Sequence, residues 1–412
     1  MLKGRDIVCL SFVTWDDHWG TPQQVMSRLA RSNRVLYVDQ AVSPLSFVTG
    51  IRSRAALARQ LRRWRQGYRE VAKNVYAAAP PPVLPLRSFK PVNAINGWIL
   101  RRWLARTARR LGIREPIVVN FQPLSPHVAS AVRPSHTVFY CVDQYAAVPI
   151  WWHSSAAAAA REAECCREAE LVVCVGRALT EARRALNPNT HFVPNAADVA
   201  HFATARDPAT AVPDDLARLP KPVAGYIGVV DFRFDAGLIA AAARDRPEWS
   251  FAVIGPVKGD ARGLEPLRAL RNVRFLGNKP VAQLPAYARG IDVCLIPYRV
   301  DEFTSHIFPL KLFEYLAAGK PIVASDLREL RPYEGTGVSI ARTPDEFVSA
   351  IEAALAGESS ERVAERQLLA RSHTWDERVE QLSALIAALV SSRPASPLLV
   401  PEPARRAGRG AR

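Results

Sequence analysis

The sequence predicts an α/β protein with two doubly wound domains, each built on a parallel sheet. Its 412 residues suffice for two or three domains, and 49% hydrophobic with 23% charged residues is a globular composition. Strand-sized apolar runs alternate with helical stretches almost from end to end, which is the pattern of βαβ units. This series starts again after residues 204–221, a stretch rich in Pro, Asp and Ala that has a linker's composition.

In the first half of the chain, apolar runs predict strands and the stretches between them predict helices. The expected strands are residues 6–12, 34–38, 117–120, 137–141, 171–175 and 191–193. The expected helices include residues 22–30, 96–111, 155–169 and 178–186. Together these elements form an N-terminal domain of residues 1–205.

The second series of strands and helices forms a C-terminal domain of residues 206–374. Its expected strands are residues 223–227, 251–254, 273–276, 293–297, 322–324 and 338–340. A further helix at residues 375–391 can return to the N-terminal domain. Residues 392–412 lack the pattern of a packed core and are expected to form a disordered basic tail.

The net charge of +16 is concentrated in one segment. Residues 51–115 hold 16 Lys and Arg against two acids, a net +14, and the tail adds +4, so the rest of the chain is almost neutral. Within this segment, residues 101–110 form a basic amphipathic pattern with Trp and Leu, which favours an anionic membrane surface. We therefore expect a basic, membrane-facing insert at 51–115. Nucleic acid or plain solvent is the alternative partner of these arginines.

The apolar runs, the first residues and the cysteines indicate where in the cell the protein is located. No apolar run approaches the ~20 residues that span a bilayer, and the first residues lack the features of a secretory signal. Six cysteines show no metal-ligand spacing, so we expect a reduced protein without a structural metal. The expected location is cytoplasmic, peripheral at the inner face of the cell membrane.

The segment from residue 292 to 326 carries the clearest chemistry. A strand ends at Pro297, a polar loop with Ser305 and His306 follows, and a helix begins near Pro309. The first amides of that helix and Lys311 suit a diphosphate, and Glu314, one turn further on, can accept two ribose hydroxyls. The alternative is that Lys311 and Glu314 form an ordinary exposed ion pair.

This segment, with its PLKLFEYLAAGKPIV run, resembles the nucleotide-sugar site of GT-B glycosyltransferases. The resemblance is to group 1, family 4-like enzymes, similar to bacterial teichuronic-acid and exopolysaccharide glycosyltransferases. Further segments that resemble the family are WDDHWGTPQQVMSRLA, HFVPNAADVAHF, GYIGVVDFRFDAGLI and SHTWDERV. The resemblance implies a GT-B fold, with two Rossmann-like domains facing across a cleft, and a nucleoside-diphosphate sugar as donor.

The resemblance also implies roles for individual residues. Glu314 binds the nucleotide ribose, and the loop and helix start face the diphosphate. Many members have a second glutamate eight positions earlier, where this chain has His306, so the donor sugar and a retaining outcome do not follow. His306 can contact phosphate instead.

The first strands of the C-terminal domain end in glycines. Gly228 allows the backbone to approach a ligand, and Arg233 stands where its guanidinium can bind the β-phosphate. Gly255 ends the next strand and resembles part of the family's base-binding wall. Arg233 and Lys311 would stabilise the leaving diphosphate, and no cofactor or metal is expected.

Polar residues also follow the strands of the N-terminal domain. The loop after the first strand supplies acceptor-side candidates, namely Trp15, Asp16, His18 and Gly20, and a second-choice catalytic carboxylate, Asp17. The first-choice catalytic carboxylate is Asp143, because it directly ends a strand. Either acid could instead cap the next helix.

Asn120 and Gln122 end a third strand and are candidate ligands of sugar hydroxyls. These candidates together predict a glycosyltransferase that moves a sugar from a nucleoside-diphosphate donor to a lipid-linked or polysaccharide acceptor in cell-surface glycan biosynthesis. The alternatives are a nucleotide-sugar isomerase or epimerase of the same architecture, and a basic nucleic-acid-binding protein.

Overall fold

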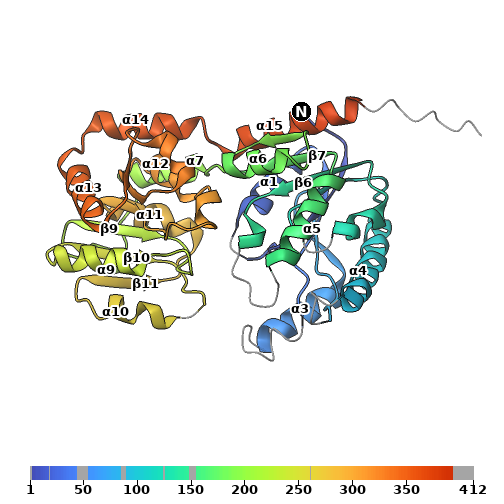
Figure 1. Ribbon diagram of the computed structural model, residues 1–412, viewed down its shortest axis with the longest axis horizontal. Coiled ribbons are helices and arrows are strands. Elements are labelled where there is room, and N and C mark those ends of the chain that lie inside the picture. Colours follow the sequence, from blue (N-terminus) through green and yellow to red (C-terminus); the bar gives the residue numbers. More distant parts are fainter. Residues whose placement is uncertain are drawn as a thin grey trace, which may run out of the picture.

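The computed structural model describes residues 2–17, 19–43, 54–84, 90–123, 126–147, 155–259 and 261–392. These residues form two α/β domains side by side, each with a central sheet between helices (Figure 1). The predicted class, with two doubly wound parallel sheets, is confirmed.

The N-terminal sheet has eight strands in the order β3-β4-β2-β1-β5-β6-β7-β8. All neighbouring pairs are parallel except β3 with β4. The central strands are buried on both faces, so their sequences are continuous apolar runs. The strands are β1 (Asp6–Leu10), β2 (Arg34–Val38), β3 (Tyr68–Ala72), β4 (Val75–Ala78), β5 (Ile117–Asn120), β6 (His136–Cys141), β7 (Leu171–Cys174) and β8 (Thr190–Phe192).

Helices cover both faces of this sheet and lead into the second domain. The α-helices are α1 (Thr21–Leu29), α3 (Arg54–Gln66), α4 (Lys90–Arg110), α5 (Ser155–Glu168), α6 (Arg177–Arg184), α7 (Val199–Ala203) and α8 (Asp214–Ala217). The 3-10 turns are η1 (Pro126–Val132), η2 (Tyr145–Ala147) and η3 (Thr204–Arg206).

The basic segment 51–115 is not an insert but part of the domain. Its strand β4 pairs in parallel with β2 and extends the sheet. Its helix α4 buries Leu100, Leu104 and Ala108 against one face of the sheet. The charges therefore occupy the outer surface of elements whose inner surface belongs to the core.

The C-terminal sheet has six strands, all parallel, in the order β11-β10-β9-β12-β13-β14. The strands are β9 (Val223–Ile227), β10 (Ser250–Ile254), β11 (Val273–Gly277), β12 (Val293–Ile296), β13 (Ile322–Ser325) and β14 (Val338–Ala341). The α-helices are α9 (Ala236–Asp245), α10 (Glu265–Arg268), α11 (Leu284–Gly290), α12 (Lys311–Ala317), α13 (Pro344–Ala356) and α14 (Ser360–Arg371). The 3-10 turns are η4 (Ala261–Leu264), η5 (Val281–Gln283), η6 (Thr304–His306) and η7 (Arg328–Tyr333).

The last helix, α15 (Trp375–Ser392), leaves the C-terminal domain and packs on α1 of the N-terminal domain (Figure 1). The backbone N–H of Leu2 donates to Ser383, and Asp376 pairs with Arg28 and Arg31. The helix thus ties the two ends of the chain together. Of the expected tail, residues 393–412 lie outside the described part of the chain.

Within the described residues, we find no helix that combines the length and the hydropathy needed to cross a bilayer.

Candidate active site

The order of the C-terminal sheet reverses between β9 and β12, because β10 lies on one side of β9 and β12 on the other. In open parallel sheets, ligands bind outside the carboxyl ends of the strands at such a reversal. The loop after β9 carries Gly228 and Arg233, and the loop after β12 carries Tyr298, Ser305 and His306. The loops that carry these predicted donor-side residues therefore start on either side of the reversal point.

Lys311, the first residue of α12, is buried beneath the loop after β9. Its Nζ donates to the hydroxyl of Tyr298 at 2.5 Å and lies 4.9 Å from the centre of the Tyr226 ring. Burial raises the pKa of Tyr298, but Lys311 and Arg233 outweigh that effect and hold it below its ordinary value. Lys311 therefore does not form the exposed ion pair with Glu314 that was the alternative.

Gly228 and Gly255 are required by packing. A Cβ on Gly255 would lie 1.9 Å from the backbone oxygen of Gly228. A Cβ on Gly228 would lie 3.0 Å from Cε of Lys311. The two glycines therefore let the loops after β9 and β10 cross closely, above the Lys311 ammonium.

Arg233 is fixed by its own loop. Its Nε and Nη2 donate to the two carboxylate oxygens of Asp231 at 2.9 and 2.5 Å, and its guanidinium lies 5.8 Å from the Tyr298 ring centre. Burial opposes the charge of Arg233, but the hydrogen bonds to Asp231 prevail and raise its pKa. Arg233 is therefore a fixed, permanently charged cation at the carboxyl end of β9.

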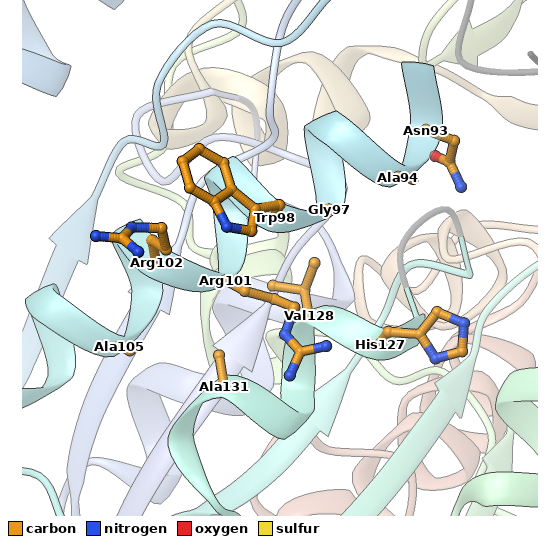
Figure 2. A pocket seen from close by; sticks show the side chains of 10 residues that line it. All are labelled: Asn93, Ala94, Gly97, Trp98, Arg101, Arg102, Ala105, His127, Val128 and Ala131. Atoms are coloured by element: carbon orange, nitrogen blue, oxygen red, sulfur yellow. The ribbon is translucent and has the colours of Figure 1, made fainter. Parts of the chain in front are cut away.

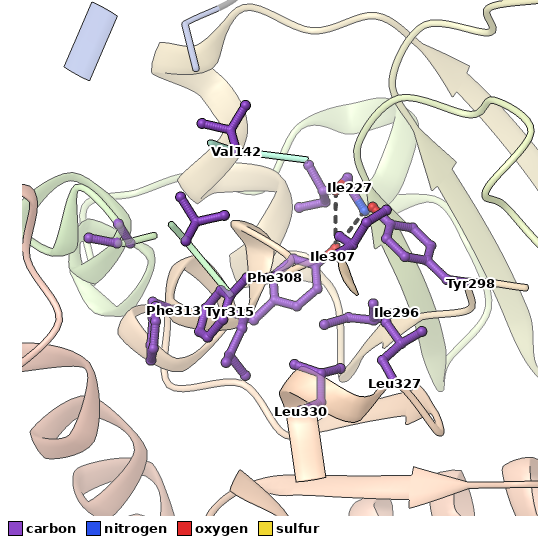
Figure 3. Close-up of a cluster of buried hydrophobic side chains, with 14 of the residues drawn as sticks. Val142, Ile227, Ile296, Tyr298, Ile307, Phe308, Phe313, Tyr315, Leu327 and Leu330 are labelled. Atoms are coloured by element: carbon purple, nitrogen blue, oxygen red, sulfur yellow. Dashed lines mark hydrogen bonds between the residues drawn. The ribbon is translucent and has the colours of Figure 1, made fainter. Parts of the chain in front are cut away.

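Glu314 is held in place by its neighbour. The hydroxyl of Tyr315, which is fully buried, accepts from the N–H of Ile227 at 2.8 Å and lies 3.2 Å from the carbonyl oxygen of the same residue (dashed lines in Figure 3). This contact joins α12 to the end of β9, within the apolar cluster that Figure 3 draws. The hydrogen bonds of Tyr315 thus fix the backbone of Glu314 next to the loop after β9.

The Glu314 carboxylate itself is half-buried and makes no hydrogen bond or ion pair with any described residue. Burial raises its pKa to about 7, although Lys311 and His201 act in the opposite direction. A desolvated carboxylate without a partner is costly in free energy, so this group is suited to accept hydrogen bonds from a ligand.

Ser305 and His306 lie in the turn η6, and their side chains bond to the loop that precedes it. The Ser305 hydroxyl donates to the carbonyl of Glu302 at 2.8 Å, and Nδ1 of His306 lies 2.8 Å from the same oxygen. This arrangement leaves Nε2 of His306 without a partner among the described residues. The contact of His306 with phosphate stays a prediction.

Asp143 follows β6 and faces the C-terminal domain. Burial raises its pKa to about 6, and Arg233 of the other domain lowers it. The loop is held through the neighbouring Gln144, which accepts from Arg183 at 2.5 Å, while Arg183 pairs with the buried Glu162 at 2.5 Å. The first-choice carboxylate thus lies near a predicted diphosphate ligand.

The loop after β1 is more structural than expected. Trp15 is only 5% exposed, with its ring against Tyr37 and Trp19, so it serves the core, and the 40% exposed Trp19 offers the accessible ring. Asp16 pairs with Arg69 and, at 2.9 Å, with Arg63, which joins the loop to β3 and α3.

The other candidates of this loop differ in how they are held. Asp17 is exposed and its side chain makes no hydrogen bond with described residues. Gly20 has an extended backbone, φ −121°, so its conformation does not require glycine. His18 lies outside the described residues.

Asn120 is also used internally: its side-chain oxygen accepts from the N–H of Gln122 at 3.0 Å. Gln122 lines a small cavity with Asp39, a residue that the sequence analysis missed. Asp39 is 2% exposed, accepts from the N–H of Trp15 at 2.9 Å, and has its pKa raised to about 7 by burial. It directly ends β2, so the rule that selected Asp143 could have found it.

The outer surface of α4 forms one wall of a groove of about 680 Å³, and η1 forms the other (Figure 2). Trp98 is 60% exposed there, and the guanidinium of Arg102 lies 5.0 Å from its ring centre. The predicted basic amphipathic helix is therefore present, and its exposed face is hollowed.

The sequence comparisons match part of the chain to known proteins. Residues 228–357 match the model of the family "Glycosyl transferases group 1". A stretch of 161 residues is 35% identical to the "Putative teichuronic acid biosynthesis glycosyltransferase TuaH" of Bacillus subtilis (strain 168). That match covers 37% of this chain and 40% of the relative, so it spans less than half of the relative's length.

Comparison with solved structures extends to almost the whole chain. A sucrose-phosphate synthase from Thermosynechococcus elongatus gives a TM-score of 0.70 at 17% identity, over 94% of this chain and 100% of that chain. Anabaena HepE, solved in complex with UDP, gives 0.59 at 14% identity, over 95% and 100%. The fold of the chain is GT-B, and the resemblance to group 1 glycosyltransferases is confirmed over residues 228–357.

Proposed function

We propose that the protein is a glycosyltransferase that takes a sugar from a nucleoside-diphosphate donor. The observation that carries this proposal is the Glu314 carboxylate, which has no partner among the described residues and lies near the buried Lys311. Lys311 and the half-buried Arg233 both contact the Tyr298 ring at the reversal point of the sheet. Glu314, Lys311 and Arg233 all lie within the stretch that matches the glycosyl transferase family.

Glu314, Arg233 and Lys311 contact different parts of the donor. Glu314 accepts hydrogen bonds from the ribose hydroxyls, which supply the donors that its carboxylate lacks. Arg233 and Lys311 stabilise the negative charge that develops on the departing diphosphate. Because these cations are fixed before the donor arrives, we propose that no metal ion is needed for this step.

The N-terminal domain supplies the acceptor side of the reaction. We propose Asp143 as the catalytic carboxylate, ahead of Asp17, because its half-buried carboxyl lies within the electrostatic reach of Arg233. Its pKa of about 6 would leave it ready to exchange a proton near neutrality.

The acceptor and the location rest on separate observations. The relative TuaH is named for teichuronic acid biosynthesis, which supports a cell-surface glycan as the product. The exposed arginines of α4 support a site at an anionic membrane surface, with a lipid-linked acceptor. We therefore propose a peripheral enzyme at the inner face of the cell membrane.

Calorimetry with UDP, the nucleotide present in the HepE structure, tests the donor site. We expect Glu314→Gln to weaken UDP binding by about tenfold or more, because the variant loses a charged acceptor. For the wild-type chain, affinity should rise between pH 6 and 8, as a carboxyl of pKa about 7 ionises, and the variant should lose this dependence.

A matched control is Glu302→Gln, which neutralises an exposed acid of the neighbouring loop. UDP affinity should be almost unchanged in that variant. Equal affinity of wild type and Glu314→Gln would contradict the donor-site assignment and would favour the alternative of a basic nucleic-acid-binding protein.

A further inference from the structure

We propose that the groove between α4 and η1 binds the phosphate-bearing end of the acceptor's lipid, a phosphate ester of a long-chain alcohol. This inference rests on the proposed glycosyltransferase function and names the chemical class of its acceptor. It goes beyond a general attraction of the basic helix to a membrane, because it assigns a single lipid molecule to a defined groove.

The groove has room for a chain beside a charged head. Two rows of α4 line it, one with Asn93, Gly97 and Arg101, the other with Ala94, Trp98 and Arg102. A Cβ on Gly97 would meet no atom within 4 Å, so the space above the helix is open. Ala94, Gly97 and Trp98 of α4, together with Val128 and Ala131 of η1, form a surface that fits an alkyl chain (Figure 2).

The charges of the groove fit an anion at one end. Arg101 and Arg102 are exposed and form no ion pair with a described residue. In Figure 2 the side chain of Arg101 extends from α4 toward η1, and Arg102 lies beside Trp98. His127 also lines the groove, and its Nε2 lies 3.1 Å from the Glu164 carboxylate, so this ring already has an acidic partner. A phosphate is therefore attracted to the arginines and not to the histidine.

The groove also adjoins a second cavity, which lies at the carboxyl ends of the strands. A second, narrow cavity of about 30 Å³ shares Asn93 and Val128 with the groove. Its walls include Asp39 and Gln122, at the carboxyl ends of β2 and β5. The groove and the strand ends are therefore adjacent at Asn93 and Val128.

The combination of an exposed Trp, apolar walls and two arginines that have no ion pair with a described residue selects this occupant. A free phosphate ion would gain nothing from the Trp98 ring or the η1 wall. An anionic membrane surface would be served equally by Arg109 and Arg110, which are exposed further along the same helix. Arg101 and Arg102 should therefore bind the lipid phosphate, whereas Arg109 and Arg110, which carry the same charge on the same helix, should not.

The test is co-sedimentation with neutral phosphatidylcholine vesicles that contain either an alkyl phosphate or phosphatidylglycerol at matched surface charge. The wild-type chain should prefer the alkyl phosphate by about tenfold. Arg101→Gln with Arg102→Gln should lose that preference. Arg109→Gln with Arg110→Gln, which removes the same charge outside the groove, should keep it.

Gly97→Leu provides a variant without any change in charge. It fills the open space, and a better helix former should not unfold α4, so we expect the preference for alkyl phosphate to disappear. UDP affinity should be unchanged in Gly97→Leu, which separates a failure of this inference from a failure of the donor site.

Two results would overturn the inference. One is equal binding to both kinds of vesicle, which would mean attraction to any anionic membrane. The other is full displacement by inorganic phosphate at an equal concentration, which would mean a site for the free anion.

Discussion

Three buried or half-buried carboxyl groups are candidates for function: Asp39 and Asp143 follow the strands β2 and β6, and Glu314 lies in α12. Burial raises the pKa of Asp39 and of Glu314 to about 7, and that of Asp143 to about 6. Groups with strongly shifted pKa values gather at functional sites. Ionising a buried carboxyl destabilises the folded state, so stability should depend on pH.

Asp39→Asn should stabilise the protein at pH 8. The folded state holds the Asp39 proton more tightly than the unfolded state, so the wild type loses stability as the pH rises from about 4 to 7. Asn cannot ionise and still accepts from the N–H of Trp15, so we expect a gain of roughly 2–4 kcal/mol at pH 8 and a much smaller one at pH 4. Urea unfolding at both pH values measures the difference, and an equal effect at both would contradict the assignment.

Single residues differ in how far the sequence predicts them. The sequence spacing selects Asp143, because it follows a strand, and Glu314, because it lies one helical turn after Lys311. Trp15 could not be judged in this way, because its burial depends on Tyr37 and Trp19, which meet it only in the fold. Likewise, nothing in the sequence shows that the Asp231 carboxylate accepts hydrogen bonds from the Arg233 guanidinium.

At the scale of elements, burial explains what could be predicted. The strands β1, β2, β5 and β9 are nearly or fully buried, and each was expected to within two residues. The strands β3 and β4 were missed, although β4, which has only four residues, is mostly buried. β3 lies at the sheet edge with mostly exposed residues, including Arg69 and Glu70, so it has no apolar run. Without β3 and β4, the basic segment looked like an insert.

Gly255→Ala should disrupt the crossing of the loops after β9 and β10. Its new Cβ would collide with the backbone oxygen of Gly228, and backbone cannot rotate away as a side chain can. We expect a loss of about 3 kcal/mol or more in unfolding free energy. The control is Gly259→Ala, also at positive φ but with nothing within 4 Å, which should cost about 1 kcal/mol. Equal losses would show that the close approach is unimportant.

At the scale of the whole molecule, the two domains are joined by buried polar contacts as well as by the chain. Glu329 of the C-terminal domain, 2% exposed, accepts from the N–H of Ala178 at the start of α6. Asn195 donates to the carbonyl of Phe308, just before α12, and accepts from Thr21 of α1. The segment that leads into α12 is therefore positioned from both domains, which the sequence of either domain alone could not indicate.

Glu329→Ala should loosen this arrangement. Glu329 serves as the missing cap of α6, which begins after Gly176 without a side-chain cap of its own. A lost cap costs about 1 kcal/mol, and because this cap comes from the other domain, the loss should appear as a larger radius of gyration in small-angle X-ray scattering. Glu329→Gln keeps an acceptor oxygen and should stay close to wild type. Arg328→Ala breaks only an exposed ion pair with Glu181 and should change nothing. An unchanged radius in Glu329→Ala would mean that α15 and the linker alone set the domain arrangement.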